Sequence, residues 1–195
     1  AKTCSKVCGL ALTSRSKGEN PIPLAGVPYH AVDGYLKKML QAGYKVAVCE
    51  QVEDPKTAKG VVKRDVVRVV TPGTLTDDML LDAKQDNFLC AINLGANDTA
   101  DISWVDISTG HFFARSMPEN RLLDELLRLS PAECLLADRR GELFEAETKK
   151  LTLDISRLTG AIVTQRPAWY FDPYQGMQRL LKHFGVATLE GFGLT

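Results

Sequence analysis

Residues 102–115 read ISWVDISTGHFFAR, and this stretch decides the fold of the second half of the chain. Two runs rich in β-branched and aromatic residues, 102–107 and 112–115, flank a Ser-Thr-Gly turn at 108–110. A third, largely apolar run, 88–94, precedes them and is joined by a polar connection that contains Asn and Asp. The pattern therefore predicts three consecutive antiparallel strands.

The sequence after these strands predicts alternating helices and strands. Ser116, Pro118 and Glu119 have the spacing of a capping box, so a helix is predicted from there to about residue 129. A strand at 133–137, a helix at 141–149, a strand at 161–164 and a last helix opened by Asp172 and ended by Gly185 follow. The residues predicted to face the core are Leu122, Leu123, Leu126 and Leu127 in the first helix, and Met177, Leu180, Leu181 and Phe184 in the last. The order β-β-β-α-β-α-β-α is that of RNase H-like folds, and we predict such a domain.

The first half of the chain predicts a smaller mixed α/β unit. Its clearest element is a helix over 31–42, where apolar residues recur at helical spacing and Gly43 follows as the terminating residue. Short apolar runs predict a buried strand at 46–49 and a second strand at 66–70. The end of a helix over the first eight residues, a short strand at 10–13 and polar loops at 16–21 and 54–60 complete the prediction.

The charge is divided between the two halves. Residues 1–75 hold 12 Lys and Arg against 6 Asp and Glu, a net charge of +6, whereas residues 76–195 hold 12 against 18, a net charge of −6. We therefore predict a basic domain over 1–75, a linker over 76–85 and an acidic domain over 86–195. A basic half favours a polyanionic partner such as nucleic acid, although two solvated surfaces with a chance imbalance explain the numbers as well.

Composition narrows the class of protein. With 195 residues, 45% hydrophobic and 25% charged, the chain is expected to fold, and no apolar run approaches the roughly 20 residues that cross a bilayer. The start is not a signal peptide, and it lacks an initiator Met, which suggests a fragment or a processed chain; together with the cysteine pattern we expect a cytoplasmic protein. The five cysteines are odd in number and form no C-x-x-C pair, which favours reduced thiols in a core over disulfides or zinc.

The sequence contains no recognised nucleotide-binding or hydrolase motif. None of the 15 glycines is followed by Lys, so there is no phosphate-binding loop of the G-x-x-x-x-G-K type. The histidines, His30, His111 and His183, have no evident nucleophile partner by spacing. Asp106 sits where an RNase H-like nuclease can carry a metal-binding carboxylate, but we favour a hydrogen-bond acceptor for the following turn. We predict no catalytic residue and no metal or other cofactor in this chain.

Several stretches resemble the MutS family of DNA mismatch-repair proteins. The segment NPIPLAGVPYHAV at 20–32 resembles the loop and helix start of its mismatch-binding domain, and CEQ at 49–51 and KRDVVRVVTPGT at 63–74 resemble the strands that follow. QDN at 85–87, DISTG at 106–110, PAE at 131–133 and GFG at 191–193 resemble its connector domain. The matches are collinear and span nearly the whole chain.

The resemblance implies a role in mismatch recognition by a non-enzymatic fragment. The family protein is a DNA-dependent ATPase and homodimer that uses ATP and Mg²⁺, but those sites lie outside this chain. The implied partners are duplex DNA with mismatches or small loops, and MutL, towards which the connector relays ATP-driven changes. No Phe here is followed by Glu two positions later, so the family's Phe-x-Glu mismatch sensor is missing and we infer truncation. Under this interpretation the residues expected to contact DNA are Arg15, Lys17, Pro23, Leu24, Lys63 and Arg64.

Two alternatives stay open at this point. The acidic half is compatible with a protein-interaction module that does not bind DNA by itself, and an RNase H-like metal-dependent nuclease is the enzymatic alternative. Charge reversal at Arg15 and Lys17 distinguishes the interaction module from a DNA-binding protein. Clustering of carboxylates around Asp106 in space would indicate the nuclease.

Overall fold

The computed structural model describes residues 1–14, 16, 20–58, 60–76, 81, 86–95, 97–138 and 142–193, without the side chains of 142–145. Most of the predicted linker 76–85 and half of the predicted loop 16–21 lie outside the described residues. The described residues form a mixed α/β structure that divides into two compact units. Unit 1 comprises 1–89 together with the turn 106–111, and unit 2 comprises 90–105 and 112–195.

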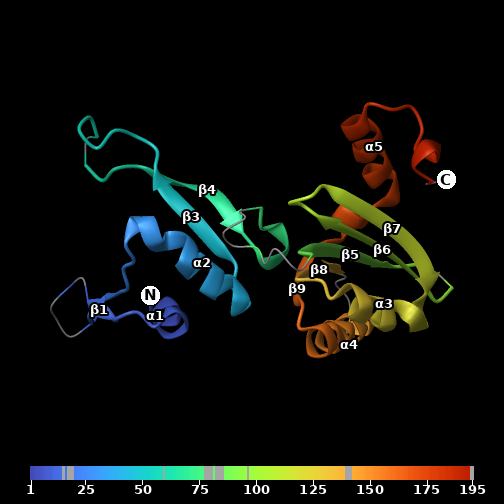
Figure 1. The fold of residues 1–195 in the computed structure, drawn as a ribbon, viewed down its shortest axis with the longest axis horizontal. Coiled ribbons are helices and arrows are strands. Elements are labelled where there is room, and N and C mark those ends of the chain that lie inside the picture. Colours follow the sequence, from blue (N-terminus) through green and yellow to red (C-terminus); the bar gives the residue numbers. More distant parts are fainter. Residues whose placement is uncertain are drawn as a thin grey trace. The chain divides into compact units, whose positions relative to one another are not determined.

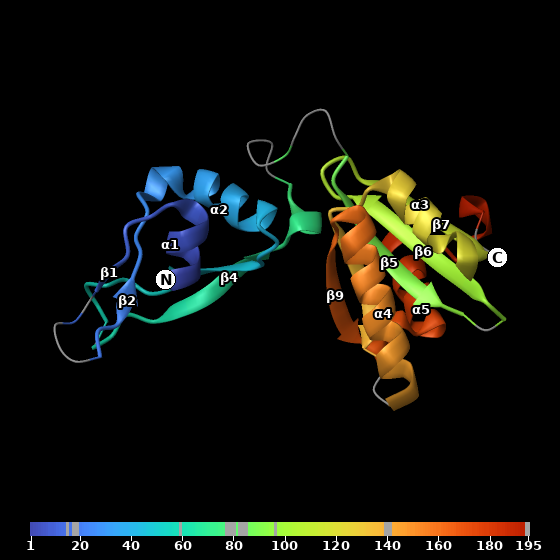
Figure 2. The same ribbon diagram turned by 90° about the horizontal axis from the view of Figure 1, so that it is seen from below.

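The described part of unit 1 contains two short helices and two antiparallel strand pairs. Its elements are α1 (Lys2–Cys8), β1 (Thr13–Ser14), β2 (Pro23–Leu24), α2 (Val32–Gln41), β3 (Val46–Gln51) and β4 (Arg64–Val70), with 3-10 turns at Tyr29–Ala31 and Pro72–Thr74. Strand β1 pairs with β2, and β3 pairs with β4 with a register shift between Val48 and Cys49. Helices α1 and α2 lie on one side of the β3–β4 ladder (Figures 1 and 2).

Helix α2 confirms the predicted helix, and its spacing sets the small core of unit 1. Leu36 and Leu40, one turn apart on α2, are buried together with Cys8 of α1. Gly43 has φ of 81°, a left-handed conformation that glycine adopts without steric cost, and the helix ends beside it.

Two details of the prediction for unit 1 were wrong. The strand predicted at 10–13 is only the pair Thr13–Ser14, and the buried strand predicted at 46–49 is a strand whose residues are exposed or half-buried. The reason is that β3 and β4 form a two-stranded ladder, which the helices cover on one side only. A continuous apolar run is buried on both faces only where both faces of its sheet are covered.

Unit 2 is built on a five-stranded sheet of order β7-β6-β5-β8-β9. Its strands are β5 (Phe88–Leu94), β6 (Thr99–Asp106), β7 (His111–Pro118), β8 (Glu133–Asp138) and β9 (Ile162–Pro167), and its helices are α3 (Leu122–Leu129), α4 (Glu142–Thr159) and α5 (Pro173–Phe184). Strands β8 and β9 are parallel. Helices α3 and α4 cover one face of the sheet and α5 lies over the other (Figures 1 and 2). The predicted RNase H-like order of elements is confirmed.

The core of unit 2 lies between the sheet and helices α3 and α4. Its fully buried side chains come from neighbouring strands and from both helices, and they include Cys90, Ile92, Ile102, Leu122, Leu126, Cys134 and Ile155. A hydrogen bond with Cys90 and burial raise the pKa of the Cys134 thiol, so it stays protonated at neutral pH. All five cysteines are free thiols. The predicted packing in a core is confirmed for Cys8, Cys90 and Cys134, and it is wrong for Cys4, which is half-buried, and for Cys49, which is exposed.

Three predictions for the helices of unit 2 were wrong. Ser116 and Pro118 belong to strand β7 and form no capping box; the helical turn begins at Glu119. Leu127 is 45% exposed, and Leu129 is buried in its place. Helix α4 extends to Thr159, ten residues beyond the predicted end.

Helix α5 begins as predicted but is less buried than predicted. The carboxylate of Asp172 accepts a hydrogen bond from the backbone N–H of Gln175 at 2.7 Å, and Gly185, with φ of 65°, ends the helix. Met177 and Phe184, expected to face the core, are 48% and 42% exposed. Among the described residues no helix combines the length and the apolar content needed to cross a bilayer.

Candidate nucleic-acid interface

The six residues predicted to contact DNA come from two stretches of unit 1, residues 15–24 and residues 63–64. Arg15 and Lys17 lie outside the described residues. Pro23 and Leu24 form β2, which pairs with β1, and Leu24 remains 47% exposed. These two side chains are therefore on the surface of the Pro-rich segment and not packed beneath it.

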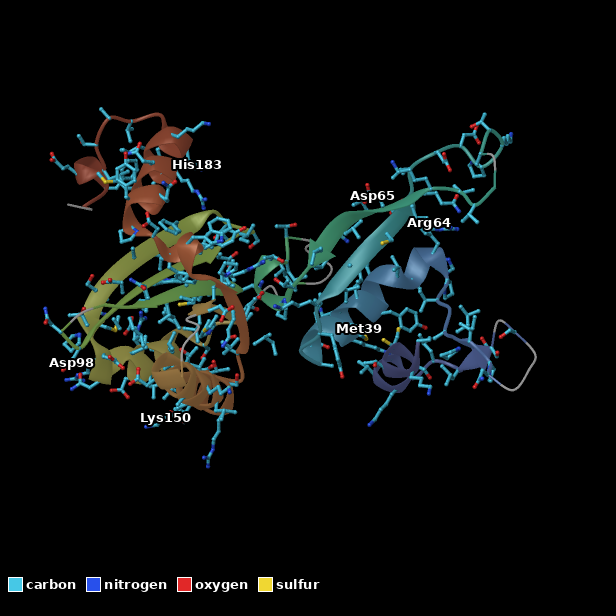
Figure 3. The ribbon with its side chains drawn as sticks, turned by 180° about the vertical axis from the view of Figure 1, so that it is seen from behind. Met39, Arg64, Asp65, Asp98, Lys150 and His183 are labelled. Carbon is cyan, nitrogen blue, oxygen red and sulfur yellow. The ribbon has the colours of Figure 1, made fainter. Side chains whose placement is uncertain are left out.

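Lys63 and Arg64 lie at the start of β4 and are both exposed. The carbonyl of Lys63 accepts a hydrogen bond from the N–H of Val52 at 3.1 Å, so the β3–β4 ladder continues one step beyond the strands. Arg64 and Asp65 are consecutive on β4 and project to opposite sides of the strand (Figure 3). The Asp65 carboxylate instead accepts a hydrogen bond from the N–H of Val66 at 2.8 Å. The Arg64 guanidinium is thus directed away from the neighbouring acid.

Acidic residues in the β3–β4 connection hold its backbone in place. Glu53 accepts a hydrogen bond from the N–H of Lys63, and Asp54 accepts one from the N–H of Lys56 at 2.9 Å. The carbonyl of Asp54 also accepts hydrogen bonds from the N–H and hydroxyl of Thr57, both at 3.1 Å. This bracing was not predicted from the sequence, although Asp followed by Pro is a turn signal that pointed to Asp54.

Among the described residues, the cations in and beside the β3–β4 connection are not neutralised by the acids around them. Within the part of the chain that the structure describes, no carboxylate forms an ion pair with Lys56, Lys63 or Arg64. All three side chains are exposed to solvent. Cations in this state are available to neutralise phosphates and to release the counterions that the phosphates hold.

The two connections lie towards the same end of unit 1. The β1–β2 pair and the β3–β4 connection extend from the end that is on the left in Figures 1 and 2. No hydrogen bond between described residues joins Pro23 or Leu24 to Lys63 or Arg64. The structure therefore places an exposed apolar pair and an exposed cationic pair at one end of the unit without direct contact between them.

Asp106 serves as the acceptor of a turn in unit 1. Its carboxylate accepts hydrogen bonds from the N–H and hydroxyl of Ser108 at 2.9 and 2.6 Å, from the N–H of Thr109 at 3.4 Å and from the N–H of Asn87 at 3.1 Å. Burial raises the pKa of Asp106, but these hydrogen bonds outweigh burial and leave the pKa below its ordinary value. The predicted role as a turn acceptor is confirmed.

The geometry around Asp106 does not fit a two-metal nuclease. Such a site needs several carboxylates around the ions. Among the residues that the structure describes, no group of three or more His, Cys, Asp or Glu side chains could hold a metal ion. Asn87 donates its backbone N–H to Asp106, and its side-chain amide donates to the carbonyl of Pro72 at 2.9 Å. The surroundings of Asp106 are those of a structural turn.

Unit 2 carries an open cleft lined by aromatic side chains. The cleft has a volume of about 820 Å³ and is lined by the start of α5, the preceding 3-10 turn Ala168–Phe171 and the ends of β5 and β8. The rings of Trp169 and Tyr170 are stacked with centroids 3.8 Å apart, and the Arg179 guanidinium lies 5.9 and 5.8 Å from them. Trp169, Tyr170 and Tyr174 are between 49% and 67% exposed. Exposed aromatic and Arg side chains are typical of protein-binding surfaces.

Two family models match this chain, one after the other along the sequence, in agreement with its two α/β units. Residues 1–79 match the model of MutS domain I, and residues 87–195 match the model of MutS domain II. The chain belongs to the MutS family. The role of this family is in DNA mismatch repair, and DNA is the partner that it implies.

Proposed function

We propose that unit 1 binds duplex DNA through the surface formed by β2 and the β3–β4 connection, and thereby contributes to mismatch recognition. The observation that carries the proposal is that Lys63 and Arg64 are exposed and form no ion pair among the described residues. The backbone of the connection that precedes Arg64 is held by hydrogen bonds to its own acidic residues. The net charge of +6 over residues 1–75 supports the same conclusion. Arg15 and Lys17 are proposed to contact the DNA backbone beside them.

The mechanism combines neutralisation of phosphates with contact by apolar side chains. Lysine and arginine contacts to phosphates fix the position of the duplex and carry no sequence information. Pro23 and Leu24, exposed on β2, would lie against the minor groove. Mispaired steps stack poorly and bend at lower cost than paired steps, so a protein that bends the duplex favours them. Because no Phe-x-Glu motif occurs in this sequence, we expect this chain to bend and discriminate weakly.

For unit 2 we propose the role of a connector that binds a protein partner. The family resemblance suggests MutL as that partner, and the aromatic cleft on α5 is the surface with the composition of a protein-binding site. Homodimerisation, ATP hydrolysis with Mg²⁺ and a cytoplasmic location are proposed for the whole family protein. We propose 1–75, 76–85 and 86–195 as the domain division.

A titration with paired and mismatched duplexes at low and moderate salt tests the DNA-binding role. We expect weak binding, a steep loss of affinity between about 50 and 200 mM salt, and little preference for the mismatch. Charge reversal at Arg15 and Lys17 is expected to weaken binding to both duplexes. Unchanged affinity after reversal would instead favour the interaction module, and strong mismatch discrimination would contradict the expectation that a chain without a Phe-x-Glu motif discriminates weakly.

A further inference from the structure

The β3–β4 connection is closed at its base by one acidic side chain. Glu53 Oε1 accepts a hydrogen bond from the N–H of Lys63 at 2.5 Å, which joins residues ten positions apart. Beside it, the carbonyl of Lys63 accepts from the N–H of Val52 at 3.1 Å. Glu53 therefore fixes the backbone of Lys63. Lys63 is one proposed phosphate contact, and it directly precedes the other, Arg64.

A second acid fixes the opposite arm of the same connection. Asp54 Oδ1 accepts from the N–H of Lys56 at 2.9 Å, and the Asp54 carbonyl accepts from the N–H groups of Thr57 and Ala58 at 3.1 and 3.2 Å. This turn holds the backbone of Lys56, an exposed residue without an ion pair among the described residues. Each arm of the connection thus has an acid that binds backbone and a cation whose side chain remains in solvent.

We propose that Glu53 is a positioning residue for nucleic-acid binding, and that Lys56 is a further phosphate contact beside Lys63 and Arg64. The inference rests on the proposed DNA-binding function. A free cationic loop loses conformational entropy when it binds, whereas a loop braced before binding loses less. The two acids are in this view part of the binding surface, although their charge has the same sign as that of the phosphates.

The sign of the effect separates this inference from simple electrostatics. Removal of a negative charge near DNA should strengthen binding if charge alone matters. Removal of the Glu53 brace should weaken binding if position matters. Glu50 provides a matched control, because it lies three residues away on β3, is exposed, and its side chain forms no hydrogen bond or ion pair among the described residues.

The experiment measures the affinity of the 195-residue chain for a fluorescently labelled paired duplex across a salt series. For Glu53→Ala we expect affinity to fall about 3–10-fold, and the salt slope to fall by about 0.9 for each phosphate that the chain no longer neutralises. Glu53→Gln keeps an oxygen acceptor and is expected to bind at least as tightly as the unsubstituted chain. Glu50→Ala is expected to bind equally well or more tightly. Lys56→Ala should lower the salt slope by about 0.9, because the chain then neutralises one phosphate fewer.

The outcomes distinguish failure of this inference from failure of the proposed function. If Glu53→Ala binds as tightly as Glu50→Ala with an unchanged salt slope, Glu53 is not a positioning residue. If Lys56→Ala leaves the slope unchanged, Lys56 does not contact a phosphate. If the double charge reversal Lys63→Glu and Arg64→Glu leaves binding of the otherwise unsubstituted chain unaltered, the DNA-binding role of this surface itself is wrong.

Discussion

Replacement of Asp106 by Asn is expected to destabilise unit 1 by an amount that its hydrogen bonds predict. The side chain is 4% exposed and accepts from Asn87 with one oxygen and from Ser108 and Thr109 with the other. In Asn one of these oxygens becomes an NH₂ group, which is a donor. Whichever way the amide is turned, the N–H of half-buried Asn87 or the N–H groups of Ser108 and Thr109 then face another donor.

The cost follows from the energies of buried polar groups. A buried N–H left without an acceptor costs about 1–3 kcal/mol, and hydrogen bonds to a neutral amide are weaker than those to a carboxylate. Because these N–H groups are only partly buried, we expect Asp106→Asn to lower the free energy of unfolding by about 1–3 kcal/mol. Asp101→Asn is a suitable control: Asp101 is exposed on the same strand, accepts from the Ser116 hydroxyl with one oxygen, and should change stability by less than about 0.5 kcal/mol.

Stability should also depend on pH through this carboxylate. Because the folded pKa of Asp106 lies below its unfolded value, its contribution is fully present above about pH 4 and is lost as pH falls through the folded pKa. Asp106→Asn lacks this contribution, so the difference between the two proteins should shrink on acidification below about pH 4.

Urea unfolding at neutral and acidic pH measures both effects, and amide hydrogen exchange at Asn87, Ser108 and Thr109 shows whether the destabilisation is local. A change below about 0.5 kcal/mol at neutral pH, or a difference that stays constant on acidification, would refute the reasoning.

Three further predictions concern unit 2. Leu126→Ala removes a fully buried side chain from α3 and should cost about 2–5 kcal/mol in urea unfolding, with DNA affinity unchanged when measured below the unfolding transition. Asp172→Ala removes the acceptor for the Gln175 N–H and should cost about 1 kcal/mol, whereas Asp172→Asn should cost less; thermal unfolding of both compares them. Glu125 accepts a hydrogen bond from Arg128 and lies near Arg115, and both cations lower the pKa of Glu125. Its stabilising contribution should therefore be lost as the pH falls below about 4. Glu125→Gln should show no such loss in an acid titration followed by circular dichroism.

Elements whose formation depends on local pattern could be predicted from the sequence. Helix α2 has apolar residues at helical spacing and a terminating Gly43, and the hairpin around Gly110 has turn residues between β-branched runs. Asp172 was identified as a cap because its side chain acts on the residue three positions later. In each case the deciding interaction lies within a few residues along the chain.

Elements that depend on distant partners could not be predicted in the same way. Ser116 has the local spacing of a helix cap, but β7 pairs with β6, the Ser116 hydroxyl donates to Asp101 and Met117 is buried, so the strand continues through it. Cross-strand pairing outweighs a local capping preference here. Leu127 was misassigned because the helix begins at Leu122, which places the buried face at positions four and seven residues later.

The candidate site was predicted only in part for a similar reason. Lys63 and Arg64 stand out in the sequence as adjacent cations after a polar loop. The hydrogen bond from the Lys63 N–H to Glu53 joins residues ten positions apart, and no residue pattern specifies it. From the sequence, Glu53 is therefore indistinguishable from any other polar loop residue. Its contact with Lys63 arises only because the fold brings the two ends of the connection together.

The most direct measurement for the central claim is a map of amide chemical-shift changes when the isotope-labelled chain is titrated with a paired DNA duplex. We predict changes in the β1–β2 pair and the β3–β4 connection, including Leu24, Lys56, Lys63 and Arg64, that disappear as salt is raised. Changes confined to the aromatic cleft of unit 2, or changes spread evenly over both units, would contradict the claim.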